Sequence, residues 1–277
     1  MQEQHCADWQ EFQEAIRSIR AAYRMSDLAA NIVRPSPLCF RGQSRAEWSL
    51  ETTLERAGHR SISFRRYARL LATIYPEIST VTDRRFNVPS YQEFDDWLSN
   101  CQREAYLPIE PPPGYEFMVY LRQHGYPSPL LDWTDSEYIA AYFAFADAPQ
   151  DDPTNCVAIY AYVERSGNFK ASGAADPTIV SAGPFVRSHP RHFTQQARYT
   201  FCRQYDQEWK YVEHQLVFDG DAASLAGKQD ILYKFTMPAS ERRDVMNELR
   251  RFNITAWTLF QTEESLMQAM AFKTMDQ

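Results

Sequence analysis

Apolar side chains recur three and four positions apart at several places in the chain, which is the spacing of a buried helix face. The first such face starts with Trp9 and Phe12, directly after Asp8. Glu11 stands in the capping-box position behind Asp8, so a helix is predicted over residues 8–23. By the same reasoning, further helices are predicted over residues 64–75, 90–101 and 115–124 and after residues 134, 240 and 262.

Short apolar runs rich in β-branched and aromatic residues predict strands. Such runs occupy residues 38–40, 130–131, 156–163, 212–218, 231–237 and 254–260, and residues 191–201 fit either an extended or a helical conformation. Helices therefore dominate the N-terminal half and strands the C-terminal half, which predicts an α+β fold. No flexible linker is evident, so a single domain is expected.

Cysteine usage and hydropathy indicate the compartment. The five cysteines stand far apart without a C-x-x-C pair, which favours free thiols in a reducing cytosol. The first ten residues lack an apolar signal segment, and no apolar run approaches the length of a membrane-spanning helix. We therefore expect a soluble, cytoplasmic protein without a membrane partner.

The formal net charge is −7, but the positive charges are gathered locally. Residues 56–76 contain five Arg and no acidic residue, and residues 187–205 contain four Arg, two His and no acidic residue. Such basic segments could meet a phosphate-bearing ligand or could pair with acidic helices elsewhere in the protein. His189, His192 and His214 lack the spacing and the carboxylate neighbours of a zinc site, so no metal is expected.

Polar residues stand where two predicted strands end. Arg41 follows the first strand and precedes Gly42, while Asp132 and Thr134 follow the second and precede a helix. A guanidinium beside a glycine suits a phosphate or carboxylate ligand. Two structural alternatives remain open, because Asp132 and Thr134 could simply cap the helix and Arg41 could form a buried ion pair with Asp132.

Several separated motifs resemble the FRG-domain family. They are FRGQS with W-x-L at Phe40–Leu50, QHGYPSPLLDWT at Gln123–Thr134, A-x-Y-F-A at Ala140–Ala144, RHFTQQARYTF at Arg191–Phe201 and the closing ITAWTLFQTEESLMQ. The resemblance spans about Phe40 to Met270. It implies one FRG-type domain over residues 1–277, with a helical N-terminal extension at 1–35, the two main motifs at 36–148 and a strand-rich half at 149–277.

The order of these motifs is also similar to that of ADP-ribosyltransferases, in which a strand-borne Arg or His precedes a Gly and a later S-T-S strand is followed by an A-x-x-F-A helix. This resemblance implies a split antiparallel sheet core and NAD as co-substrate. Arg41 would pair with an NAD phosphate or ribose, Thr134 would orient the ribose and nicotinamide, and an aromatic face would come from Trp133, Tyr138 or Tyr142. The implied NAD-binding residues are Arg41, Gly42, Gln43, His124, Asp132, Trp133, Thr134, Tyr142 and Gln195.

The catalytic polar group is left open by the sequence. Gln195 and Gln196 could serve as hydrogen-bonding amides, and Glu213 could supply a carboxylate. The resemblance implies an ADP-ribosyltransferase effector of a toxin–antitoxin or phage-defence system, with RNA favoured as acceptor, protein next, and an antitoxin as possible partner. The alternatives are a non-catalytic module that binds a nucleotide or partner and, third, a nuclease-like effector, for which clustered carboxylates are missing.

Overall fold

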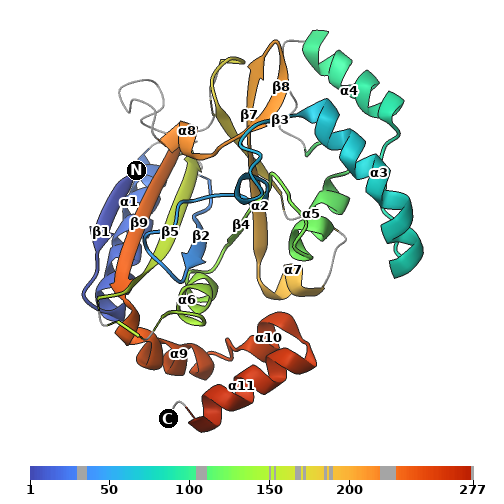
Figure 1. The fold of residues 1–277 in the computed structure, drawn as a ribbon. Coiled ribbons are helices and arrows are strands. Elements are labelled where there is room, and N and C mark those ends of the chain that lie inside the picture. The colour runs from blue at the N-terminus through green and yellow to red at the C-terminus, as the bar shows by residue number, and fades with distance from the viewer. Residues whose placement is uncertain are drawn as a thin grey trace.

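The computed structural model shows a large mixed sheet with helices packed around it, so the predicted α+β class is confirmed (Figure 1). The structure describes residues 1–29, 36–103, 111–149, 151–152, 154–165, 170, 173–183, 186, 190–218 and 229–275. His189 lies outside the described residues.

The described strands form one hydrogen-bonded sheet in the order β1-β9-β5-β2-β4-β7-β8-β3, with β6 paired to β7. The pair β1–β9 is parallel and the other pairs are antiparallel, so the sheet is mixed rather than wholly antiparallel. The strands are β1 (Gln2–His5), β2 (Cys39–Gln43), β3 (Ile62–Ser63), β4 (Leu131–Thr134), β5 (Cys156–Arg165), β6 (Thr178–Ala182), β7 (Ala197–Asp206), β8 (Glu208–Val212) and β9 (Gln229–Pro238).

The described helices begin largely where capping residues predicted them. Ser90 and Glu93 form the expected reciprocal cap, because the Ser90 N–H donates to Glu93 Oε2 at 2.7 Å and the Glu93 N–H donates to Ser90 Oγ at 3.3 Å. The α-helices are α1 (Trp9–Ala29), α2 (Thr53–Arg56), α3 (Phe64–Thr82), α4 (Tyr91–Arg103), α5 (Tyr115–Gln123), α6 (Glu137–Phe145), α7 (Pro190–Thr194), α8 (Gln215–Phe218), α9 (Arg242–Arg251), α10 (Ala256–Phe260) and α11 (Glu263–Met275). A 3₁₀ turn at Ala239–Glu241 precedes α9.

Two strand predictions are wrong. Residues 254–260 form helix α10, because Thr255 and Thr258 build a capping box that starts a helical turn. Residues 212–218 contain only the last residue of β8 and then helix α8. The ambiguous segment 191–201 contains both conformations, α7 and the start of β7, and Gln196 between them has a left-handed φ of 47°.

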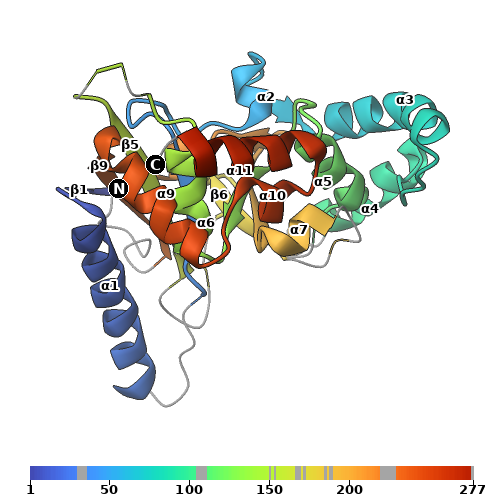
Figure 2. The same cartoon turned by 90° about the horizontal axis from the view of Figure 1, so that it is seen from below.

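The two faces of the sheet carry different apolar clusters. Along β5, Val157, Ile159 and Ala161 pack with side chains of α1, α6 and α9, while the alternate residues Tyr160 and Tyr162 face the opposite cluster. The N-terminal segment belongs to the first cluster. The predicted helical extension therefore begins with a strand, β1, and packs into the main sheet (Figures 1 and 2).

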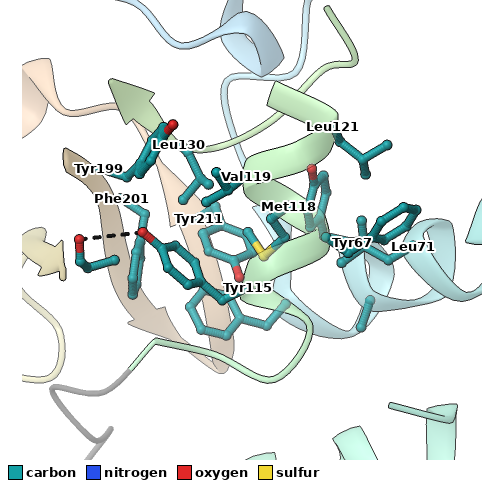
Figure 3. Close-up of a cluster of buried hydrophobic side chains, with 14 of the residues drawn as sticks. Tyr67, Leu71, Tyr115, Met118, Val119, Leu121, Leu130, Tyr199, Phe201 and Tyr211 are labelled. Atoms are coloured by element: carbon teal, nitrogen blue, oxygen red, sulfur yellow. Dashed lines mark hydrogen bonds between the residues drawn. The ribbon is translucent and has the colours of Figure 1, made fainter. Parts of the chain in front are cut away.

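A third cluster lies around α5 at the other end of the sheet, where α3 and α4 also pack (Figures 1 and 3). Figure 3 shows its aromatic and aliphatic side chains between α3, α5 and the strands β7 and β8. Tyr199 of β7 belongs to this cluster and also reaches the site described below. The core thus fixes one wall of that site.

The sheet is weakest where β2 meets β4. Only Phe40 and Thr134 are paired across this junction, whereas β2 pairs with β5 and β4 pairs with β7 along their whole lengths. Arg41 crosses the gap, because its Nη1 donates to the carbonyl oxygen of Asp132 at 2.9 Å. The Arg41 side chain therefore links β2 to β4, whereas backbone pairing makes such links elsewhere in the sheet.

Helix α6 packs with its backbone directly against β2. A Cβ atom at Gly42 would lie 1.9 Å from the carbonyl oxygen of Ala140 and 2.6 Å from the amide nitrogen of Ala144. No side chain fits at residue 42 without moving this helix. The Phe40–Gly42 triplet and the A-x-Y-F-A helix are therefore two sides of one packing contact.

Candidate functional site

A cavity of about 510 Å³ opens where β2 and β4 diverge. Its volume lies within the range of about 300–1,000 Å³ that is usual for small-molecule sites. Residues from β2, the loop before α2, α2, α5, β4, α6, α7, β7 and α10 surround it, so distant parts of the chain meet there. The lining residues are Phe40, Arg41, Gly42, Gln43, Ser44, Arg45, Trp48, Arg56, Arg122, Gln123, Asp132, Trp133, Thr134, Phe143, Asp147, Arg191, Gln195, Ala197, Tyr199 and Phe260.

The cavity is strongly positive although the protein is acidic. Its lining has two carboxylates, Asp132 and Asp147, and five guanidinium groups. Those five belong to Arg41, Arg45, Arg56, Arg122 and Arg191. Such an excess of guanidinium groups favours an anionic ligand, and a phosphate group matches their planar donor geometry.

Asp132 lies between two of these arginines. Arg41 Nη1 and Arg122 Nη2 each donate to Asp132 Oδ1 at 2.5 Å. The surrounding protein desolvates the carboxylate, which opposes ionisation, but the Arg122 and Arg41 charges outweigh this and hold the pKa of Asp132 well below its usual range. The side chain still keeps 44% of its surface accessible because it lines the hollow. The predicted ion-pair alternative is therefore present, and it lies inside the cavity.

Replacing Asp132 by Asn is expected to lower the free energy of unfolding by about 1–2 kcal/mol at pH 7, a value reduced for the partial exposure of the carboxylate. Because the folded-state pKa of Asp132 is depressed, its contribution is complete above the ordinary Asp pKa of about 3.9 and is lost as the pH falls toward the folded-state value. Urea unfolding of wild type and variant over a pH series checks this. The difference should shrink below about pH 4, and a constant difference would contradict it.

Arg56 adds a third guanidinium next to this pair. Desolvation and the neighbouring charges of Arg41 and Arg122 lower the pKa of Arg56. Arg56 forms no ion pair with any carboxylate of the described residues. A ligand phosphate would relieve this repulsion, which makes the three arginines a ready anion site.

Two predicted ligand-binding side chains are already bonded within the protein. Thr134 Oγ1 donates to the carbonyl oxygen of Gln195 at 2.7 Å and accepts from the Ser136 N–H at 3.2 Å. Gln195 Nε2 donates to the carbonyl oxygen of Leu259 at 3.1 Å. In this structure the two residues tie β4, the α7–β7 corner and α10 together, so they shape the cavity wall.

The most exposed aromatic side chain in the cavity lining, that of Trp48, was not among the predicted ligand-binding residues. Trp133 is buried, stacks on Tyr162 at 5.3 Å between ring centroids and donates from Nε1 to Thr200 Oγ1 at 2.9 Å. Trp48 lines the cavity with 49% of its surface exposed. Its indole is therefore accessible to stack on a flat ligand group.

Replacing Trp48 by Ala is expected to weaken binding of a nucleotide ligand about 2–12-fold, because a stacking contact is worth about 0.5–1.5 kcal/mol. Titration calorimetry with NAD measures this directly. Trp257→Ala is the matched control, since Trp257 is 43% exposed and lies on α10 outside the lining of the cavity. Equal affinities of the Trp48 and Trp257 variants would exclude a stacking role for Trp48.

The structure brings together seven of the predicted site residues: Arg41, Gly42, Gln43, Asp132, Trp133, Thr134 and Gln195. It places the other four outside this cavity. His124 packs on Tyr120 at 4.4 Å between ring centroids, and Glu213 accepts a hydrogen bond from Arg60 Nη1 at 2.6 Å. Gln196 and Tyr142 line two other hollows.

Two arginines of the cavity could have been suggested by the basic segments of the sequence. Arg56 and Arg191 belong to these segments and line the cavity. Arg65 and Arg198 of the same segments instead form ion pairs with Asp95 and Asp135, which was the alternative prediction for these segments. Arg122 precedes the Gln123–Thr134 motif directly, which is a weak local signal. Trp48 belongs to the W-x-L motif and Tyr199 to the RHFTQQARYTF motif, but neither motif predicted that its aromatic side chain reaches the cavity.

A comparison with known protein families matches one segment of the chain. Residues 36–153 match the FRG domain family. The matched segment contains β2, β4 and α6, so the match covers both sides of the contact at Gly42 and the Arg41–Asp132 pair. Five cavity residues, Arg191, Gln195, Ala197, Tyr199 and Phe260, lie beyond the matched segment. No curated protein and no solved structure matches the chain.

Metal sites and membrane spans are both absent from the part of the chain that the structure describes. No three His, Cys, Asp or Glu side chains among these residues gather in a way that could hold a metal ion. His214 is instead buried, with its Nε2 2.9 Å from Thr200 Oγ1. None of the helices in the described ranges is both long and apolar enough to cross a bilayer.

Proposed function

We propose that this cavity binds NAD and that the protein transfers ADP-ribose from NAD to an acceptor. The observation that carries the proposal is the set of five arginines that line the cavity at the junction of β2 and β4 in an acidic protein. The negatively charged pyrophosphate of NAD suits the Arg41, Arg56 and Arg122 guanidinium groups. The exposed indole of Trp48 suits a flat ring of the dinucleotide.

The reaction breaks the bond between C1′ of the ribose and the nicotinamide nitrogen. The bond electrons leave with nicotinamide, and an acceptor lone pair forms the new bond to C1′ while the acceptor loses a proton. The transition state resembles an oxocarbenium ion, so the enzyme must hold the pyrophosphate and ribose rigidly as nicotinamide departs. Arg41 and Arg122 are suited to holding the pyrophosphate because Asp132 fixes their orientation.

The sheet supports an ADP-ribosyltransferase-like core as part of this proposal. The single residue pair between β2 and β4 divides the sheet into two halves, β1-β9-β5-β2 on one side and β4-β7-β8-β3 with β6 on the other. The arginine cavity lies at this division. A cleft between two half-sheets is the arrangement that the motif resemblance implies.

We further propose that the protein is a cytoplasmic effector of a toxin–antitoxin or phage-defence system and that its acceptor is nucleic acid, with RNA favoured. Expression of the wild type should then arrest growth, and Arg41→Ala should relieve the arrest at equal protein level. Growth that is unaffected by wild-type expression would count against the toxin role.

A binding module without catalysis is the second candidate. It is favoured by the internal bonds of Asp132, Thr134 and Gln195, which leave few free polar groups in the cavity. Release of nicotinamide separates the two candidates. A transferase releases nicotinamide from NAD when acceptor is present, whereas a binding module binds NAD or another nucleotide and returns it unchanged.

A further inference from the structure

The proposed transfer needs a group that accepts the acceptor's proton, and a carboxylate can do this where, as in the described lining of this cavity, no histidine is present. Among the described residues, the carboxylates that line the arginine cavity are Asp132 and Asp147. Glu213, the carboxylate suggested by the sequence, is bonded to Arg60 outside the cavity. The choice of base therefore lies between two aspartates.

Asp132 is unsuited to the task. Both Arg41 and Arg122 donate to its Oδ1, and these charges favour the ionised form so strongly that the carboxylate is a very weak base. Its contacts with the arginines instead suit a role in orienting them. Asp132 is therefore a positioning residue.

Asp147 is in a different position. It follows the last turn of α6, is exposed to solvent and forms no ion pair with a described residue. Two hydrogen bonds fix the backbone just before Asp147. The Ala146 N–H donates to the carbonyl oxygen of Tyr142 at 2.8 Å, and Arg242 Nε donates to the carbonyl oxygen of Phe145 at 3.1 Å. Asp147 thus presents an available carboxylate from a fixed backbone.

A second hollow, of about 270 Å³, adjoins the arginine cavity at Asp147, which lines both. It lies between the end of α6 and the helices α9, α10 and α11, which group together in Figure 2. Its lining includes the apolar side chains of Met246 and Phe272, and its charged groups besides Asp147 are Arg242 and Arg250. The Arg242 guanidinium lies over the Phe272 ring, 5.4 Å from its centroid. Guanidinium groups beside apolar and aromatic side chains suit a phosphate with an attached flat base.

We propose that Asp147 is the catalytic base of the transfer and that the acceptor, a nucleotide unit of a nucleic acid, occupies the hollow between α6, α9 and α11. This inference rests on the proposed function. NAD would lie in the arginine cavity on one side of Asp147 and the acceptor on the other. The acceptor's nucleophilic oxygen or nitrogen attacks C1′, its proton passes to the Asp147 carboxylate, and nicotinamide leaves with the electrons of the broken bond.

Tyr142 lies beside this base and supports the arrangement. Desolvation and the negative charge of Asp147, opposed by Arg242, raise the pKa of Tyr142 to about 12. The phenol therefore keeps its proton at neutral pH and does not compete with Asp147 as a base. Tyr142 was suggested by the sequence as a partner of nicotinamide, and here it borders the acceptor hollow.

Asp147→Asn tests the role of the base. The variant should bind NAD within about twofold of the wild type by calorimetry and transfer label from NAD at least about 100-fold more slowly, since a general base contributes about 10²–10⁴-fold. The matched control is Asp244→Asn, an exposed carboxylate on α9 outside both hollows, which should transfer at the wild-type rate. Transfer by Asp147→Asn at the wild-type rate overturns the inference.

The acceptor site is tested with Arg250→Gln, with its exposed neighbour Arg251→Gln as the control that does not line the hollow. The probes are labelled NAD with a mixed-sequence single-stranded RNA and its DNA counterpart. We expect Arg250→Gln to lower label transfer about 10-fold while NAD affinity stays unchanged, as loss of one phosphate contact would. Label on protein alone, or equal transfer by both variants, overturns the acceptor assignment. Wild type that releases no nicotinamide instead rejects the proposed function itself.

Discussion

Replacing Arg41 by Ala is expected to lower the affinity for NAD about 100-fold. Arg41 is the strand-borne guanidinium at the junction of β2 and β4, where it is nearly buried and held by Asp132. A charge-assisted hydrogen bond to a ligand phosphate contributes about 1.5–3 kcal/mol, which corresponds to about 10–100-fold in affinity, and a pre-oriented guanidinium falls at the upper end. Titration calorimetry with NAD measures the effect.

The matched control for this prediction is Arg66→Ala. Arg66 lies in the first turn of α3, is exposed and does not line the cavity, so its removal should leave NAD affinity unchanged. Arg41→Lys should recover only part of the loss, because an ammonium group cannot reproduce the planar pair of donors. Both variants should retain cooperative unfolding, since Arg122 still pairs with Asp132. Wild-type affinity in Arg41→Ala would remove Arg41 from the site.

Replacing Gly42 by Ala is expected to lower the free energy of unfolding by about 3 kcal/mol or more. The added methyl group would overlap the backbone of α6 at Ala140 and Ala144, and backbone atoms cannot rotate away as a flexible side chain can. Relief requires α6 to move off β2, which opens the apolar cluster between them. Urea unfolding monitored by circular dichroism gives the free-energy difference.

Gly58→Ala is the matched control for Gly42→Ala. Gly58 has a left-handed φ of 88°, and no atom lies within 4 Å of the position that its Cβ atom would take, so the substitution costs only backbone strain of about 1–2 kcal/mol. The comparison separates crowding at Gly42 from the general cost of replacing a glycine. Equal losses in the two variants would contradict the close contact of α6 with β2.

The sequence predicted the elements whose patterns are local. Local patterns predicted the helices α1, α4 and α5 and the strands β2, β5 and β9. In each of these elements, the apolar spacing or the capping residues that signal it lie within a few positions of one another. Strand β1 was missed, because its four residues are all exposed and show no apolar alternation. Its place depends on parallel backbone pairing with β9, more than two hundred positions away.

The wrong strand at 254–260 has a similar cause. Ile254, Trp257 and Phe260 are residue types that favour strands, but the Thr255–Thr258 cap starts a helix that buries Ala256 and Leu259 against the core. Five residues are too few for periodicity to distinguish the two conformations. Capping chemistry decided the outcome here.

The candidate site was predictable only where its residues belong to one of the recognisable sequence motifs. Arg41 and Asp132 could be paired from the sequence because both follow short apolar strands. Arg56 and Arg122 join them from α2 and α5, and only the tertiary fold brings these helices to the same cavity. The same holds for Asp147, whose position between two hollows depends on how α6, α9 and α11 pack.

The most direct test of the proposed function is incubation of the purified protein with NAD labelled in its adenylate phosphate, in the presence of RNA, DNA and protein acceptors. The wild type should release nicotinamide and transfer the label covalently to an acceptor in equal amounts. Arg41→Ala should do neither at the same NAD concentration, while Arg66→Ala should match the wild type. NAD that remains intact with the wild type, with no label on any acceptor, would contradict the account.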